Sequence, residues 1–153
     1  MPRIVVLKSS DGSDVFNWNI DANVGLNSLN KQVDFELVQF GYFAESQDAR
    51  VPQESRTIFA NVVPGSRYTG GASDPLTLAI LEHQKIHGGT QDGHISVIRG
   101  STGFYNAAST FLLVGLNASM RALLGSNFPR IDSHAKCPPT LKAAVARCFD
   151  IPK

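Results

Sequence analysis

Two histidines in this sequence have a spacing that could bind a metal ion. His83 and His87 are four positions apart, which on a helix places both imidazoles on one face, and His94 follows seven positions later. Imidazole nitrogens are common zinc ligands. A metalloprotease of this type would need a glutamate directly after the first histidine as its general base, and Gln84 occupies that position. We expect no metal site and interpret the histidines as ordinary packing and capping residues, with metal binding as the alternative.

A second candidate chemistry is a thiol nucleophile. Cys137 lies three residues from His134, but a reactive thiolate needs a positioned base, and only Asp132 is near enough in sequence to orient that histidine. Cys148 comes eleven positions later, a separation that fits no familiar zinc spacing. We interpret the cysteines as buried or idle thiols, with a disulfide across the final helix as the alternative in an oxidising compartment.

No other motif specifies a reaction. Ser101 and Ser109 are not part of a nucleophile-elbow motif, and the glycine pairs at 70–71 and 88–89 match no phosphate-binding loop. We therefore expect a protein that is not an enzyme, has no catalytic residues and uses no cofactor.

A recognition site is the better-supported kind of site. Residues 46–73 are rich in proline, glycine, serine and arginine, and we predict a long loop there, with a short strand at 57–63. Aromatic faces beside cationic side chains suit sugars and peptides. The alternative is a solvated loop whose aromatic rings cover the N-terminal hairpin. The candidate ligand-binding residues are Arg56, Phe59, Arg67 and Tyr68.

Composition limits the class of protein. The chain has 153 residues, with 42% hydrophobic and 18% charged residues, which is typical of one globular domain spanning 1–153. The net charge of +1 argues against a strongly basic nucleic-acid binder, so we expect no nucleic-acid partner. Acidic residues outnumber basic ones in 1–54, and the reverse holds in 55–153. The sequence leaves the oligomeric state open.

The N-terminal segment 1–22 has the pattern of a β-hairpin. Residues 4–8 and 15–20 are β-prone runs, and Asp11-Gly12 between them is a strong turn pair. Alternation in the second run predicts one apolar face that covers the helical part, made of Phe16, Trp18 and Ile20.

Helix signals follow. Asn30 is a good N-cap for a helix to about Glu45, with Asp34 in its first turn. Asp74-Pro75 begins a second helix and Gly88-Gly89 ends it, with an inward stripe at Leu76, Ala79, Ile80, His83 and Ile86-His87.

Two further helices complete the prediction. The first runs from about 106 to 125 and is apolar nearly all round, as expected of a central helix. The second begins at Pro138-Pro139 and continues through Cys148 in a basic C-terminal extension, 126–153. A strand or extended link is expected at 95–98. The fold class is therefore α+β and mainly α, with an N-terminal β-hairpin on a three-helix core (24–125) and a short C-terminal helix.

The sequence contains no recognisable export or membrane signal. Charge comes too early, and the apolar run is too short, for residues 1–7 to be a signal peptide. The longest apolar stretch, 107–124, is interrupted by polar residues and is too short to span a bilayer. We expect no membrane span and a cytoplasmic location at synthesis, with any export by a non-classical route.

Two stretches resemble the peptidoglycan-binding-like superfamily, the small three-helix modules attached to many bacterial wall hydrolases. In 24–39, a glycine loop leads to Asn30, then Asp34, then Leu37-Val38-Gln39 on the first helix. In 74–84, Thr77, Ala79-Ile80 and Gln84 are followed by an Asp92-Gly93 turn. The first inter-helix loop is much longer than is usual in the family, and Gly70-Gly71-Ala72-Ser73-Asp74 replaces the usual Asp-Gly-x-Phe-Gly.

The resemblance implies structural and functional expectations. Gln39 and Gln84 are expected to hydrogen-bond to loop backbone, and Asp92-Gly93 to reverse the chain so that the third helix returns against the first two. The implied function is a non-catalytic module that binds bacterial cell-wall peptidoglycan, associated with a phage particle or a secretion machine. The alternative is a protein-interaction adaptor or virion component that reuses the fold without glycan binding.

Overall fold

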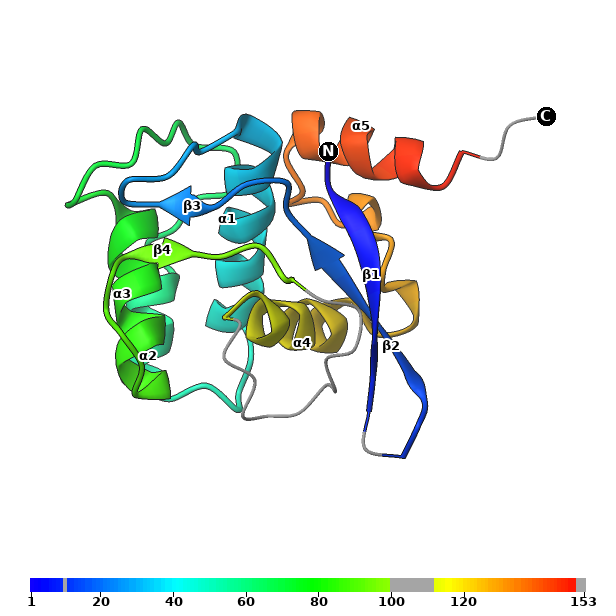
Figure 1. The fold of residues 1–153 in the computed structure, drawn as a ribbon, viewed down its shortest axis with the longest axis horizontal. Helices are drawn as coiled ribbons and strands as arrows, with labels where there is room; N and C mark the ends of the chain where they lie inside the picture. The colour runs from blue at the N-terminus through cyan, green and yellow to red at the C-terminus, as the bar shows by residue number, and fades with distance from the viewer. Residues whose placement is uncertain (10, 100–111, 151–153) are drawn as a thin grey trace.

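The structure, a computed structural model, describes residues 1–9, 11–99 and 112–150. It has the α+β, mainly helical fold expected from the sequence. A β-hairpin lies at one side, α2 and α3 lie at the other, and α1 and α4 lie between them (Figure 1). The elements in chain order are β1 (Arg3–Lys8), β2 (Asp14–Asn19), β3 (Val24–Gly25), α1 (Gln32–Ser46), α2 (Gln53–Phe59), α3 (Pro75–His87), β4 (His94–Ile95), α4 (Leu112–Leu124), two 3-10 turns (Gly125–Asn127 and Ile131–Ser133) and α5 (Pro139–Cys148).

The predicted hairpin is confirmed. Strands β1 and β2 pair antiparallel, with Val6 opposite Phe16. Trp18 and Ile20 are fully buried, but Phe16 is 48% exposed, so the predicted apolar face is wrong at that residue. The reason is that the turn end of the hairpin projects beyond α4, whereas the other end lies against the helices (Figure 1).

The first helix begins one residue later than an Asn30 cap requires, with Lys31 in the N-cap position and no side-chain cap. The amide of Asn30 is used elsewhere: its Oδ1 accepts from the Gly25 backbone N–H at 2.7 Å, and its Nδ2 donates to the Gly25 carbonyl at 2.9 Å. Asp34 lies in the first turn as predicted, and its carboxylate accepts from the backbone N–H groups of Asp21 and Ala22.

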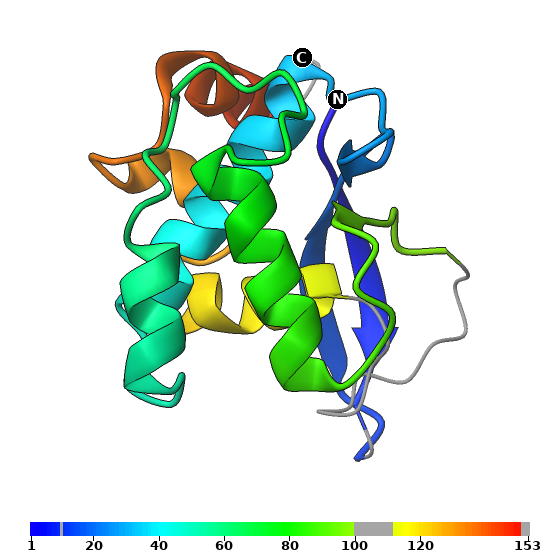
Figure 2. The ribbon, with the colours of Figure 1, turned by 90° about the vertical axis from the view of Figure 1, so that its left-hand side faces the viewer.

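The segment predicted to be a long loop with a strand contains the helix α2 instead. The prediction of a strand at 57–63 is wrong, because Gln53–Phe59 is helical. Thr57 and Ile58 are β-branched and favour a strand locally. Tertiary packing overrides that preference, because the helix buries Phe59 between the rings of Tyr42 and His83. Figure 2 shows α2 and α3 side by side.

Helix α3 has the predicted start and end. The Asp74 carboxylate accepts from the Leu76 N–H at 2.8 Å, and Gly88 takes the left-handed conformation that closes the helix. Leu76, Ala79, Ile80 and His83 are buried as predicted. Ile86 and His87 are exposed, contrary to the predicted stripe, because they lie in the last turn, at the end of the packed face.

Two glutamines tie helices to loops, as the resemblance implied. Gln39 donates to the Ser66 carbonyl at 2.9 Å and accepts from the Gly65 N–H at 3.0 Å. Gln84 donates to the His94 carbonyl at 3.0 Å and accepts from the Gly93 N–H at 2.9 Å. The hydrogen bonds of Gln84 hold β4 beside β3, with which it pairs. The strand expected at 95–98 is shorter than predicted and consists of His94 and Ile95.

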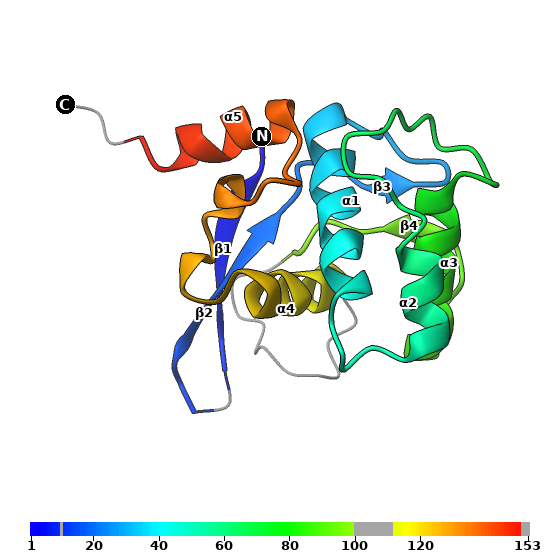
Figure 3. The same ribbon diagram turned by 180° about the vertical axis from the view of Figure 1, so that it is seen from behind.

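Helix α4 is central, as its apolar sequence predicted. It packs on α1 and on β2 (Figure 3), and Leu113, Val114 and Leu116 are buried. Asn117, also fully buried, joins this helix to the hairpin: its Oδ1 accepts from the Trp18 N–H at 2.6 Å, and its Nδ2 donates to the Trp18 carbonyl at 2.9 Å. Positions 106–111 of the predicted helix lie outside the described residues.

The short C-terminal helix α5 is confirmed and packs against α1 and the turn at Ile131–Ser133. It buries Leu141, Ala144 and Val145. None of the helices in the described part of the chain is long and apolar enough to cross a bilayer.

Candidate functional site

The four residues predicted to bind a ligand do not form a shared exposed surface. Phe59 is fully buried against Tyr42, with ring centroids 5.0 Å apart. Tyr68 is also buried: its ring packs on Phe35, and its hydroxyl lies 2.6 Å from that of Thr77. Because both rings belong to the core, the expected exposed aromatic surface is not formed.

The two arginines of that prediction have different environments. Arg56 is partly buried on α2, where one guanidinium nitrogen donates to the Gln53 amide at 2.8 Å, while Nε is buried without a hydrogen-bond partner. Arg67 is exposed in the segment between α2 and α3. Neither arginine lies beside an exposed aromatic ring from the predicted set.

The three candidate metal-ligating histidines are in unlike environments. His83 is buried and His87 exposed, with ring centroids 4.8 Å apart. His94 lies beyond the turn that follows α3, with its Nδ1 3.4 Å from an Asp92 carboxylate oxygen. Among the described residues, no group of three or more His, Cys, Asp or Glu side chains is positioned to hold a metal ion.

The cysteines are both free thiols, so the disulfide considered from the sequence is not present. Burial raises the pKa of Cys137 to about 12, which keeps it protonated and unreactive at neutral pH. The His134 imidazole has other contacts: its Nδ1 accepts from the Lys136 N–H at 3.0 Å, and its ring packs against Phe40 and Phe43. Cys148 is exposed, and its thiol donates to the Pro2 carbonyl.

The most perturbed titratable groups form a buried cluster around His83. The Tyr42 hydroxyl lies 3.0 Å from Nδ1 of His83, and a Glu45 carboxylate oxygen lies 4.0 Å from its Nε2. Desolvation is the main cause of the shifts. It lowers the pKa of His83 to about 3, raises that of Glu45 to about 7 and raises that of Tyr42 well above 10.0.

Shifted pKa values often mark functional sites, but buried structural networks produce them as well. His83 and Glu45 are 2% and 7% exposed, and neither lines one of the open hollows described below. Gly115 of α4 lies next to the imidazole: a Cβ added at this glycine would lie 3.4 Å from Nε2 of His83. We therefore assign the cluster to the stability of the core.

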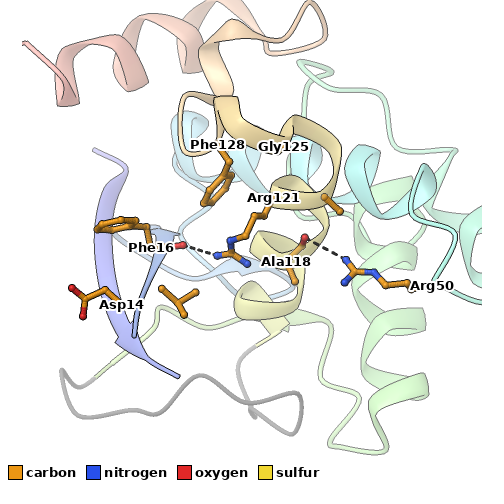
Figure 4. Close-up of a pocket in the computed structure, with 9 residues that line it drawn as sticks. Asp14, Phe16, Arg50, Ala118, Arg121, Gly125 and Phe128 are labelled. Carbon is orange, nitrogen blue, oxygen red and sulfur yellow. Dashed lines mark hydrogen bonds between the residues drawn. The ribbon is translucent and has the colours of Figure 1, made fainter. Parts of the chain in front are cut away.

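An open hollow of about 650 Å³ lies between β2 and α4. Two guanidinium groups and two phenyl rings line this hollow (Figure 4). One ring comes from β2 and the other from the turn that follows α4, while one guanidinium group comes from α4 and the other from the turn that follows α1. The four side chains are those of Phe16, Arg50, Arg121 and Phe128. A volume of this size is in the range of small-molecule and short-oligomer sites.

Local contacts orient the two arginines of the hollow. Arg121 donates to the Phe16 carbonyl at 2.7 Å, and its guanidinium carbon lies 4.8 Å from the centre of the Phe128 ring (Figure 4). Arg50 makes a two-point contact with the Asp48 carboxylate at 3.0 and 2.7 Å. Hydrogen bonds from Arg50 lower the pKa of Asp48 to about 2, and Ser119 also donates to this carboxylate.

Such an arrangement can bind an anionic or polar ligand. Guanidinium groups recognise carboxylates by paired hydrogen bonds, and phenyl faces pack against the C–H surfaces of sugars and peptides. Asp14, which pairs with Lys8, adds a carboxylate at the hairpin end of the hollow.

Sequence reasoning missed this hollow because its residues are far apart in the chain. Alternation in the hairpin assigns Phe16 to its covered face, and Arg50 lies in the segment that the sequence predicts to be a long loop. The available signal was the basic character of the chain beyond Met120, where Arg121 and Phe128 both lie.

Comparison with protein-family models, with curated proteins and with solved structures finds no match to this chain.

Proposed function

We propose that this protein is a non-catalytic module that binds bacterial cell-wall peptidoglycan. The observation that carries the proposal is the hollow between β2 and α4, where two arginine guanidinium groups and two phenyl rings line one open space. The sequence resemblance described above supplies the ligand class.

The chemistry of the hollow suits that ligand. Peptidoglycan combines sugar rings bearing acetamido groups with short peptides that end in carboxylates. Arg50 and Arg121 would attract a peptide carboxylate by their positive charge, while Arg50 keeps its two-point contact with Asp48 and Arg121 its hydrogen bond to the Phe16 carbonyl. Phe16 would pack on a sugar ring, since almost half of this side chain is exposed at the edge of the hollow.

The non-catalytic part of the proposal rests on the titratable groups described above. Cys137 is protonated, and the Glu45–His83 pair is enclosed in the core. Hydrolysis of a glycosidic or peptide bond by protein groups needs an acid or base that can reach the substrate. Among the described residues that line the hollow, the acid is Asp14, which is paired with Lys8.

The test is co-sedimentation of the purified protein with intact peptidoglycan sacculi at low and high salt, with the supernatant analysed for soluble fragments. We expect retention that persists at high salt, because stacking and short hydrogen bonds are screened less than long-range attraction. Retention lost at high salt, or none at all, would contradict specific binding. Release of fragments would contradict the absence of catalysis.

A further inference from the structure

A second open hollow lies on the other side of the molecule, between α2 and α3. It encloses about 580 Å³. Its floor and walls are formed mainly by apolar side chains from the end of α2 and the outward face of α3: Ile58, Pro75, Leu78 and Leu81. Figure 2 shows these two helices side by side.

The apolar lining of this hollow is accessible to a ligand. Leu78 is 47% exposed, although it lies in the middle of a helix whose opposite face is fully buried. Burial of a large aliphatic side chain by a partner is favourable, because it removes apolar surface from water.

The polar residues around the apolar lining narrow the ligand class. Glu82 and Lys85 lie about one turn apart on α3, and Asn61 and Gln91 add side-chain amides. The charged groups sum to zero, which does not favour a fatty acid or another amphiphilic anion. Each amide has both a donor and an acceptor, which matches the alternating N–H and C=O groups of a peptide backbone.

A sugar ligand fits less well. None of the described residues that line the hollow is aromatic, so a sugar would have no ring to stack on.

We propose that the hollow between α2 and α3 is a docking site for a short peptide segment of a partner protein. The segment inserts an apolar side chain against Leu78 and Leu81, and places a basic and an acidic group opposite Glu82 and Lys85. This site is separate from the hollow between β2 and α4, so the protein could bind a wall ligand and a protein partner at once.

The test selects peptides from a phage-displayed library of random sequences on the immobilised full-length protein, then measures the affinities of the synthesised peptides by fluorescence anisotropy. We expect the selected peptides to contain an aliphatic or aromatic residue flanked by charges. Leu78→Asp should weaken binding by at least about tenfold. Leu29→Asp is the matched control, since Leu29 is 75% exposed in the loop before α1.

A charge reversal tests the polar contacts. Lys85→Glu should weaken an acidic peptide several-fold, and replacement of the peptide's acid by lysine should restore its affinity. No enrichment of peptides, or equal affinity for wild type and Leu78→Asp, would overturn the proposal. So would a fluorescent fatty acid that binds here while the peptides do not. Sacculus binding by Leu78→Asp should equal that of wild type, so the two proposals fail independently.

Discussion

The hydroxyl of Tyr42 on α1 lies 3.0 Å from Nδ1 of His83 on α3, and both side chains are excluded from water. Because the pKa of His83 is lowered to about 3 by burial, the imidazole is neutral at pH 7 and can accept a hydrogen bond. The contact is a polar link between two helices inside an apolar core, where the alternative for each group is an unsatisfied buried atom.

Removal of this hydroxyl should therefore destabilise the fold. Tyr42→Phe leaves Nδ1 of His83 without its partner and should lower the free energy of unfolding by about 1–3 kcal/mol at pH 7. Urea denaturation measures the loss, and circular dichroism checks that the native fold is retained. A loss below about 0.5 kcal/mol, the range of an ordinary surface substitution, would contradict the assignment.

The pH dependence of stability follows from His83 and Glu45 acting in opposite directions. The folded pKa of His83 is depressed from 6.5 to about 3, so its contribution to stability is lost as pH falls from 6.5 towards 3. The folded pKa of Glu45 is raised from 4.5 to about 7, so its contribution is lost as pH rises from 4.5 through 7. Between pH 4.5 and 6.5 the two nearly cancel.

In Glu45→Gln, the pH dependence of the free energy of unfolding should show the effect of His83 without the opposing effect of Glu45. The free energy of unfolding of this variant, relative to that of wild type, should rise with pH from 4.5 to 7, by up to about 1.4 kcal/mol per pH unit. Urea titrations at five or more pH values, for both proteins in the same buffers, would measure the difference. Parallel pH profiles for variant and wild type would contradict the raised pKa of Glu45.

Gly25 is required where the two short strands meet. Its φ is +126°, and a Cβ there would lie 2.1 Å from the Gly93 carbonyl oxygen. Gly25→Ala should cost about 3 kcal/mol or more, because backbone of the opposite strand would have to move. Gly12→Ala is the matched control: its φ is +85°, but its Cβ would contact nothing within 4 Å, so the cost should be about 1–2 kcal/mol. Equal melting temperatures for the two variants would contradict the close approach.

Asn117 should anchor the hairpin to α4. Asn117→Ala removes three hydrogen bonds, two of them to the backbone of Trp18, and should cost about 2–4 kcal/mol. The chain has one tryptophan, so the fluorescence of Trp18 reports this contact directly. We expect the emission maximum to shift to the red in Asn117→Ala. It should not shift in the control Asn61→Ala, which alters an exposed amide. An unshifted spectrum in Asn117→Ala would contradict the anchoring role.

Elements with local signals could be predicted from the sequence. Helix α3 is the clearest case, because Asp74 caps it, Pro75 begins it and Gly88 closes it. Each of these signals can be recognised from neighbouring residues in the sequence alone. Helix α2 could not be predicted in this way. Its β-branched residues Thr57 and Ile58 favour a strand, and the helix depends on Phe59 reaching a space between α1 and α3 that exists only after folding.

The candidate site was beyond sequence reasoning for a related reason. Aromatic and cationic side chains of the loop at 46–73 were predicted to be exposed, but Phe59 and Tyr68 were needed for the core. Hydrophobic alternation placed Phe16 inside, and only the projection of the hairpin past α4 exposes it. The distance in sequence between Phe16 and Phe128 leaves no local pattern that could connect them.

The most direct test of the proposed function compares sacculus binding by variants of the hollow between β2 and α4. Phe16→Ser and Arg121→Gln should each reduce the fraction retained at high salt by about tenfold or more, while leaving melting temperature within a few degrees of wild type. Arg67→Gln removes an exposed arginine of the loop that the sequence favoured, and should bind as wild type does. Full retention by Phe16→Ser and Arg121→Gln would contradict the account, whatever the behaviour of Arg67→Gln.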